Sequence, residues 1–284
     1  MTLVSIAIPT HNRRDLLERA LDSALAQTHA PIEVVISDNH STDGTADLCR
    51  ERAAADDRIR YLRLPVNEGP VRNFNAVLTA AGGAYVMALA DDDWLEPDYV
   101  QRCLAVHQAE GGHALVAGRA RYWDGARHVR DSTDHDHASD APGRRVLEFW
   151  RTVDDAACFY GLIPAQTLRR LLPLEPVIAF DWLFCARAAA LGRVRTVRDT
   201  TIHRSVGGTS VSRETMSAQV GIPRLQVQLS PLFIAWFAFV DIVRPAGVLT
   251  GVALPRRVAL GARAAGIVLR RFLTLSAIRR RLAG

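Results

Sequence analysis

Strand-like and helix-like segments alternate four times in the first ninety residues, and no other feature of the chain constrains its fold as strongly. Each strand-like run is short and apolar, and each is followed by a turn and a stretch with one apolar helical face. Strands that are apolar throughout are buried on both faces, as in a parallel sheet. The alternation therefore predicts a doubly wound, mostly parallel α/β sheet with right-handed crossovers. The expected strands are residues 3–8, 32–37, 59–64 and 85–90.

The chain continues with further segments of both kinds. Residues 97–108 and 182–191 have helical patterns, and residues 114–123 are expected to form another strand. Residues 124–145 are polar and irregular, and we interpret them as a mobile surface loop. Its His135 and His137 have a spacing that could bind a metal, but the loop interpretation is favoured.

Polar residues follow all four predicted strands, at the ends that meet along one edge of such a sheet. Open α/β sheets bind ligands at this edge. A carboxylate such as Asp38 can accept a hydrogen bond from a nucleotide base, and Arg72 can hold a phosphate. The set suits a nucleoside diphosphate with a metal, and it lacks the Gly-rich motifs of dinucleotide folds and P-loops. The four groups are residues 9–12, 38–41, 67–73 and 91–93.

Three consecutive carboxylates, Asp91, Asp92 and Asp93, directly follow the fourth strand. At about 4 Å each like-charged pair costs roughly 1 kcal/mol in water and about 4 kcal/mol near a protein surface. A divalent cation removes this repulsion, and Mg²⁺ and Mn²⁺ both accept carboxylate ligands. The alternative is a solvated acidic turn that caps the helix beginning near Pro97.

The composition of the chain limits the cellular compartments and the binding partners that can be expected for it. Its 284 residues are 49% hydrophobic, which is ample for a core, and its four cysteines are scattered without a Cys-x-x-Cys spacing. Buried free thiols in a reducing compartment are therefore expected. The first apolar run is too short for a signal peptide. We expect a cytoplasmic protein, or one attached to the membrane from that side. Nucleic acid is not an expected partner, because the basic residues are not interleaved with aromatic ones.

Residues beyond 220 form a basic and apolar tail with ten arginines and one acidic residue, Asp241. The apolar run 232–254 is interrupted at Asp241, so neither half has the roughly 20 residues needed to span a bilayer. Residues 256–275 are expected to form an amphipathic helix that suits an anionic lipid surface. Packing on the rest of the chain is the alternative. The arginines predicted on one face of this helix are Arg256, Arg257, Arg263, Arg270 and Arg271.

Five segments resemble motifs of the family 2 glycosyltransferases with the GT-A fold, in the right order and spacing over residues 2–212. They are residues 5–13 (SIAIPTHNR), 34–45 (VVISDNHSTDGT), 84–98 (AYVMALADDDWLEPD), 180–182 (FDW) and 203–210 (HRSVGGTS). The resemblance implies an inverting transferase that uses a nucleotide sugar. Ala90 stands where many members carry the first Asp of their D-x-D segment, and Phe180 stands where Glu often precedes the base. The Q-x-x-R-W motif of processive synthases is absent, which favours transfer of a single sugar.

The resemblance also implies roles for individual residues. Asp181 would be the general base that takes the proton of the acceptor hydroxyl, with a helix N-cap as the alternative role. Asp92 would bind Mn²⁺ or Mg²⁺ directly. Asp93 and His203 are further candidate ligands, and a buried or loop histidine is the alternative for His203. The nucleotide sugar would be bound by Pro9, Thr10, Asn12, Arg13, Asp38, Asn39, Arg72, Asn73 and Asp91.

We therefore expect a GT-A catalytic domain over residues 1–215, with a nucleotide-sugar half to about residue 110 and an acceptor half after it. A helical extension over residues 216–284 would follow, peripheral on the cytoplasmic face of the inner membrane. The expected activity is transfer of one sugar to a glycan or polyprenyl-linked acceptor during assembly of cell-surface polysaccharide. The alternatives are a metal-dependent nucleotidyltransferase and a non-catalytic nucleotide-sugar-binding module.

Overall fold

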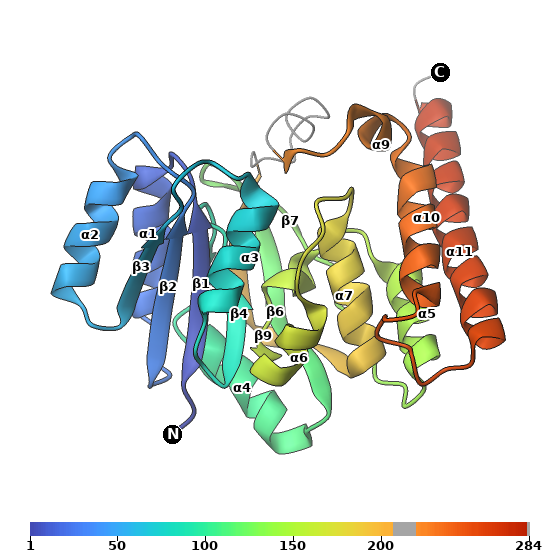
Figure 1. The fold of residues 1–284 in the computed structure, drawn as a ribbon, viewed down its shortest axis with the longest axis horizontal. Helices are drawn as coiled ribbons and strands as arrows, with labels where there is room; N and C mark the ends of the chain where they lie inside the picture. The colour runs from blue at the N-terminus through green and yellow to red at the C-terminus, as the bar shows by residue number, and fades with distance from the viewer. Residues whose placement is uncertain (207–219, 283–284) are drawn as a thin grey trace.

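The computed structural model describes residues 1–206 and 220–282, so residues 207–210 of the expected motif at 203–210 lie outside the described residues. A five-stranded sheet with the order β3-β2-β1-β4-β8 forms one half of the fold (Figure 1). Its first four strands are parallel, and β8 joins them antiparallel. This is the doubly wound arrangement predicted from the alternation. The strands are β1 (Val4–Thr10), β2 (Ile32–Asp38), β3 (Ile59–Arg63), β4 (Tyr85–Ala88) and β8 (Ile163–Pro164).

The register of this sheet aligns the strand ends that carry polar residues. Thr10 at the end of β1 pairs with Asp38 at the end of β2, and Ala7 pairs with Ala88 at the end of β4. The residues that follow β1, β2 and β4 therefore emerge along the same edge, as expected for parallel strands.

Helices cover both faces of this sheet. Figure 1 shows α3 (Pro70–Ala80) in front of it and α1 (Arg14–Leu25) behind it, next to α2 (Thr45–Ala55). The apolar stripe of α1 is fully buried through Leu17 and Leu21. Burying such a side chain is worth about 1.5–3 kcal/mol, so this face fixes the helix on the sheet.

A second, four-stranded sheet has the order β5-β9-β6-β7. Its long central strands run parallel to each other, and an isolated bridge between Val116 and Leu162 connects it to the first sheet. Helix α4 (Tyr99–Glu110) packs against it, and the buried Tyr99 hydroxyl accepts a hydrogen bond from the Gly118 N–H (3.0 Å). The strands are β5 (Trp94–Leu95), β6 (His113–Asp124), β7 (Arg127–Asp131) and β9 (Arg193–Ser205).

The interpretation of residues 124–145 as a surface loop is wrong. The segment contains β7 and the first turn of α5 (Pro142–Thr152), and His135 and His137 are only 1% and 2% exposed. Strand β7 is exposed along its whole length, so it has no apolar alternation by which the sequence could reveal it. The elements that follow are η1 (Ala157–Tyr160), α6 (Ala165–Leu171) and α7 (Phe180–Leu191).

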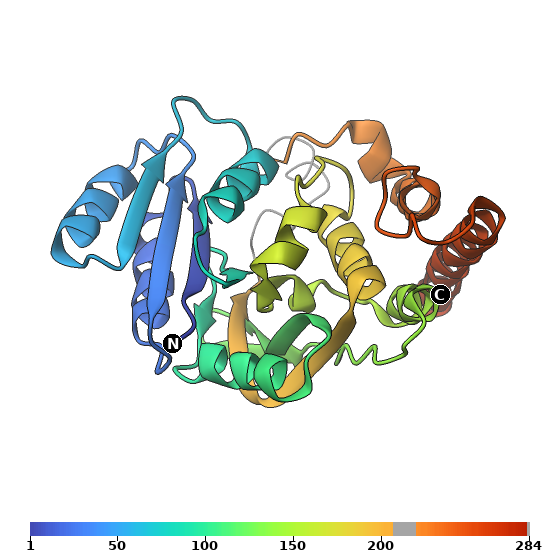
Figure 2. The ribbon, with the colours of Figure 1, turned by 60° about the horizontal axis from the view of Figure 1, so that its bottom comes forward.

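The last helices are α9 (Arg224–Gln228), α10 (Ser230–Val243) and α11 (Leu254–Leu282). Helices α10 and α11 lie side by side at the end of the molecule opposite α2, as both views show (Figure 2). No helix among residues 1–206 and 220–282 is both long enough and apolar enough to cross a membrane. The four cysteines are buried free thiols that form no disulfide with one another, as predicted.

The predicted arginine face of α11 needs correction at Arg257 and at Arg271, whose side chain is half-buried. Arg257 is buried rather than solvated, and its Nη1 donates to the carbonyl oxygens of Val243 (3.3 Å) and Arg244 (2.8 Å) at the end of α10. An arginine can satisfy open carbonyl groups at a helix end, which the helical wheel alone does not reveal. Arg256, Arg263 and Arg270 are exposed, as predicted.

Candidate functional site

A pocket of about 1490 Å³ opens at the edge where the parallel strands of the first sheet end. Its walls come from both halves of the fold: the loops after β1 and β2, the start of α3, the end of β4, the start of α7 and the end of β9. The predicted site residues that line it are Pro9, Thr10, Asn12, Arg13, Asn39, Asn73, Asp91, Asp92 and Asp181. Most of the predicted site is therefore brought together in one cavity.

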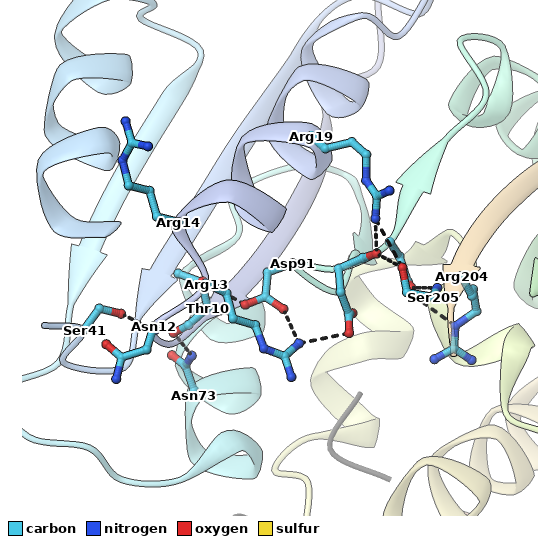
Figure 3. Close-up of polar contacts among 12 residues, drawn as sticks. Thr10, Asn12, Arg13, Arg14, Arg19, Ser41, Asn73, Asp91, Arg204 and Ser205 are labelled. Atoms are coloured by element: carbon cyan, nitrogen blue, oxygen red, sulfur yellow. Dashed lines mark hydrogen bonds and ion pairs between the residues drawn. The ribbon is translucent and has the colours of Figure 1, made fainter. Parts of the chain in front are cut away.

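Arg13 connects two of the three consecutive aspartates (Figure 3). Its Nη1 lies 3.0 Å from Asp91 Oδ1 and 2.9 Å from Asp92 Oδ2. Asp91 Oδ2 also accepts a hydrogen bond from the Thr10 hydroxyl (2.8 Å). Burial raises the pKa of Asp91 to about 6, although the adjacent Arg13 cation acts in the opposite direction. Two carboxylate oxygens therefore converge on one cationic nitrogen that lines the pocket.

Asp93 has a different environment. Its side chain is 1% exposed, and it accepts hydrogen bonds from Arg204 Nε (3.0 Å) and from the Ser205 N–H (3.0 Å) on β9. The Ser205 hydroxyl in turn donates to the Asp92 carbonyl (2.7 Å). Asp93 thus ties the turn after β4 to the end of β9, while Asp91 and Asp92 face the pocket.

Asparagine side chains fix the loops around the pocket. Asn73 on α3 accepts from the Ser37 hydroxyl (2.6 Å) and donates to the carbonyl groups of Ser37 and Thr10, which joins α3 to the ends of β1 and β2. Asn39 donates to the Asn67 side chain (2.8 Å) and accepts from the Glu68 N–H (2.8 Å). The predicted asparagines therefore contact loop backbone as well as lining the cavity.

Asp181 lies across the pocket, in the first turn of α7. The N-cap of this helix is Ala179, so Asp181 is not the N-cap that was its alternative role. Its Oδ1 accepts from the Trp182 N–H (2.9 Å), and burial raises the pKa of its carboxyl above the ordinary value. A carboxylate with a raised pKa that lines a cavity has the properties of a general base.

Four predicted residues are not among the described residues that line the pocket: Asp93, discussed above, and Asp38, Arg72 and His203. Asp38 is 0% exposed and accepts from the Ser41 N–H (2.8 Å) and the Tyr61 hydroxyl (2.9 Å). Arg72 extends into solvent beside Glu68. His203 stacks on Trp94; its Nδ1 accepts from Trp123 Nε1 (3.0 Å), and its Nε2 lies 2.8 Å from Glu96 Oε1.

The second sheet adds pocket residues that the sequence did not indicate. Arg204 lies over the ring of Tyr160, and its guanidinium donates to the hydroxyls of Tyr122 (3.2 Å) and Tyr160 (3.3 Å). Arg130, Asp154 and Asp155 line the same side. The available signal was the position of Arg204 next to His203 in the final motif. Tyr122 meets it through the pairing of β6 with β9, and Tyr160 meets it from η1; no local pattern reveals either contact.

The donor set fits a divalent cation at Asp91 and Asp92. Both offer carboxylate oxygens to one point, now occupied by Arg13 Nη1, and both line the pocket. Hard divalent cations bind through such oxygens. In contrast, both ring nitrogens of His203 have partners, and Asp93 is held by Arg204 and Ser205.

Comparison with known sequences gives a family match over more than half of the chain. The sequence model described as glycosyl transferase family 2 matches residues 5–164. An uncharacterised glycosyltransferase of Nostoc sp. is 30% identical over 231 residues, which are 76% of this chain and 68% of that protein. A GalNAc(5)-diNAcBac-PP-undecaprenol beta-1,3-glucosyltransferase of Campylobacter jejuni is 35% identical over 119 residues, 42% of this chain and 38% of that protein.

Solved structures share the fold over nearly the whole chain. TarS of S. aureus in complex with UDP superposes with a TM-score of 0.59 at 16% identity, covering 96% of this chain and 92% of that one. The mannosyltransferase PcManGT of Pyrobaculum calidifontis, in complex with GDP-Man and Mn²⁺, gives a TM-score of 0.56 at 18% identity, covering 97% and 80%. At such low identity the likeness establishes the fold.

Proposed function

Because this chain belongs to glycosyl transferase family 2, we propose that it transfers a single sugar, with inversion, from a nucleotide diphosphate sugar to an acceptor hydroxyl. The acceptor is a glycan or a lipid-linked glycan in the assembly of cell-surface polysaccharide. The observation that carries the proposal is the pocket itself, which has Asp91 and Asp92 on one wall and the partly buried Asp181 on another.

The donor occupies the part of the pocket formed by the first sheet. Thr10, Asn12 and Asn39 border the nucleoside, and Arg13 and Asn73 lie toward the diphosphate. Asp38 and Arg72 are assigned to the base and the diphosphate through the resemblance, and this assignment requires both side chains to change partners on binding. Asp91 and Asp92 would hold Mn²⁺ or Mg²⁺, which would supply Lewis-acid stabilisation of the departing nucleoside diphosphate.

Asp181 takes the proton of the acceptor hydroxyl. A hydroxyl is a poor nucleophile until its proton is removed, and a carboxylate within hydrogen-bond reach does this most effectively when its pKa is raised toward the working pH. Burial acts on Asp181 in that direction. Attack by the activated oxygen opposite the leaving diphosphate inverts the anomeric carbon.

Two observations support a lipid-linked acceptor at a membrane. The Campylobacter jejuni relative is named for an undecaprenol-linked substrate, and the solvent side of α11 carries Arg256, Arg263 and Arg270. A basic helix face is attracted to anionic lipid. We therefore assign the protein to the cytoplasmic face of the inner membrane.

The experiment is product analysis after incubation with nucleotide sugars and Mn²⁺. A thermal-shift panel first identifies the donor that raises the Tm. With that donor and a glycan or polyprenyl-linked acceptor, we expect release of nucleoside diphosphate, loss of turnover with EDTA, and a product whose anomeric configuration is opposite to that of the donor.

Each alternative gives a different result. Release of pyrophosphate would identify a nucleotidyltransferase instead. Binding of the donor without turnover on any acceptor would favour a non-catalytic module. Turnover that is insensitive to EDTA would show that the reaction does not require a metal. A product that retains the anomeric configuration of the donor would exclude direct in-line displacement.

A further inference from the structure

A second group of metal-binding side chains lies away from the strand-end aspartates. One ligand atom each from His135, Asp154 and Asp155 lies within 4.8 Å of the others. His135 belongs to the segment between β7 and α5, and the two aspartates belong to the turn between α5 and η1. Asp154 and Asp155 line the pocket beside Arg130, so two of the three side chains border the cavity.

His135 is a buried side chain without hydrogen-bond partners. It is 1% exposed, and neither Nδ1 nor Nε2 has a partner among the residues that the structure describes. Buried polar nitrogens are almost always satisfied, so a ring with two open nitrogens next to carboxylates is a candidate metal ligand.

The surroundings hold this ring in place. The backbone N–H of His135 donates to the Thr196 hydroxyl (2.7 Å), and the rings of Phe149 and His137 pack against the imidazole with centroids 5.8 Å away. Burial lowers the pKa of His135, which favours the neutral form with a free lone pair. That form is the one that binds a metal.

The two carboxylates are oriented by neighbouring donors. Asp155 accepts from the Ala157 N–H (2.9 Å) at Oδ1 and from Arg130 Nη1 (2.8 Å) at Oδ2, and Asp154 accepts from the Thr133 hydroxyl. A carboxylate oxygen has two acceptor sites, so each can keep these bonds and still bind an ion. Donors of this kind fix the orientation of metal ligands.

We propose that His135, Asp154 and Asp155 form a second divalent-metal site, separate from Asp91 and Asp92, that takes a transition-metal ion such as Zn²⁺. One imidazole and two carboxylates suit Zn²⁺ and its neighbours in the first transition series better than Mg²⁺ or Ca²⁺. Three protein ligands leave at least one coordination position for water or for an acceptor oxygen. The ion would also tie the segment before α5 to the turn after it.

The experiment measures Zn²⁺ binding to the full chain by titration calorimetry, in an Asp91→Asn, Asp92→Asn background that removes both strand-end ligands. We expect one equivalent of Zn²⁺ to bind, with an affinity at least tenfold lower after His135→Ala or Asp154→Asn. His128→Ala is the matched control, because His128 is an exposed β7 histidine paired with Asp131 and lies outside the cluster. The affinity of the His128→Ala variant for Zn²⁺ should equal that of the background variant.

Asp154→Asn keeps the test decisive if His135→Ala does not fold, because Asp154 is exposed and its replacement leaves the core unchanged. Co²⁺ absorption gives a second readout: a bound ion with one nitrogen and two oxygen ligands should show d–d bands that are lost in both ligand variants. Absence of Zn²⁺ binding in the background, or equal affinity in Asp154→Asn, would overturn the proposal. Neither readout depends on sugar transfer, so the result is independent of the proposed function.

Discussion

The burial of Asp181 has one consequence for catalysis and another for stability. Asp181→Asn keeps the shape of the side chain but cannot accept a proton, so we expect kcat to fall by roughly 10²–10⁴ while the donor still binds. Steady-state kinetics and calorimetric titration of the donor check this. If turnover stays within a few-fold of the parent, the base lies elsewhere.

The stability of the same variant should change in the opposite direction. Burial raises the pKa of Asp181 in the folded protein, so the folded state binds this proton more tightly than the unfolded chain does. The ionised carboxylate therefore lowers the free energy of unfolding, and this loss of stability develops as the pH rises through the folded-state pKa. Asp181→Asn removes it, and chemical denaturation at pH 7 should give an unchanged or higher free energy of unfolding. A clear loss would indicate a structural role instead.

Single residues were predicted well where a strand end dictates their position and poorly where a long-range partner does. Asp91 and Asp92 follow β4 directly, so the rule for parallel sheets was enough to place them in the pocket. Asp38 and His203 belong to the family-like motifs as well. Hydrogen bonds with Tyr61 and Trp123 hold their side chains, and neither residue is among the described residues that line the pocket. His135 is buried because Phe149, fourteen positions later, packs on it, and a polar local sequence does not indicate such a partner.

At the scale of elements, the contact of α10 with α7 depends on an ion pair. Arg187 on α7 and Asp241 on α10 lie 2.6 Å apart between Nη2 and Oδ1, and each side chain is 11% exposed. Removing one partner of a fully buried pair costs about 3–5 kcal/mol, because the other charge stays buried without compensation. This pair keeps some contact with water, and Arg187 Nη2 also lies 3.7 Å from Glu175 Oε2, so we expect Asp241→Ala to lower the free energy of unfolding by roughly 1–2 kcal/mol.

Chemical denaturation checks this value. Glu148→Ala is the control, because Glu148 pairs with Arg144 on the surface of α5, and an exposed pair of this kind contributes at most about 0.5 kcal/mol. Equal effects of the two substitutions would show that the α7–α10 pair does not hold the extension.

The sequence predicted elements with strong periodicity and missed those without it. The first four strands and three helices follow the predicted alternation closely. Strand β9 continues from Arg193 to Ser205 although its pairing with β6 jumps from Val197 to Thr201 between Gly118 and Arg119. The residues that bulge out there, including Asp199, break the apolar pattern, and only the neighbouring strand shows that the ladder resumes.

At the scale of the whole molecule, the helical extension presents a charged and apolar surface at one end. Arg256, Arg263 and Arg270 of α11 are exposed, and α10 exposes Leu232 and Trp236. Each arginine near an anionic leaflet contributes about 1 kcal/mol. We expect the full chain to float with anionic liposomes at low salt, and to float more weakly at high salt because the attraction is screened.

The test variant changes Arg256, Arg263 and Arg270 to Gln and should float poorly. The control changes Arg50, Arg58 and Arg127 to Gln, which alters the net charge equally at exposed positions outside the extension. Loss of flotation in both variants would indicate attraction by overall charge. A parent chain that never floats would favour a soluble acceptor.

The guanidinium of Arg13 gives the pocket a built-in counter-ion. Because one nitrogen contacts both Asp91 and Asp92, an ion that binds between these carboxylates as proposed would have to exchange with an arginine. The exchange would leave the charge around the two aspartates close to balanced before and after loading. It would also release a tethered positive group when the anionic donor needs one. In the proposed function, metal loading and diphosphate capture would then be coupled by the movement of one side chain.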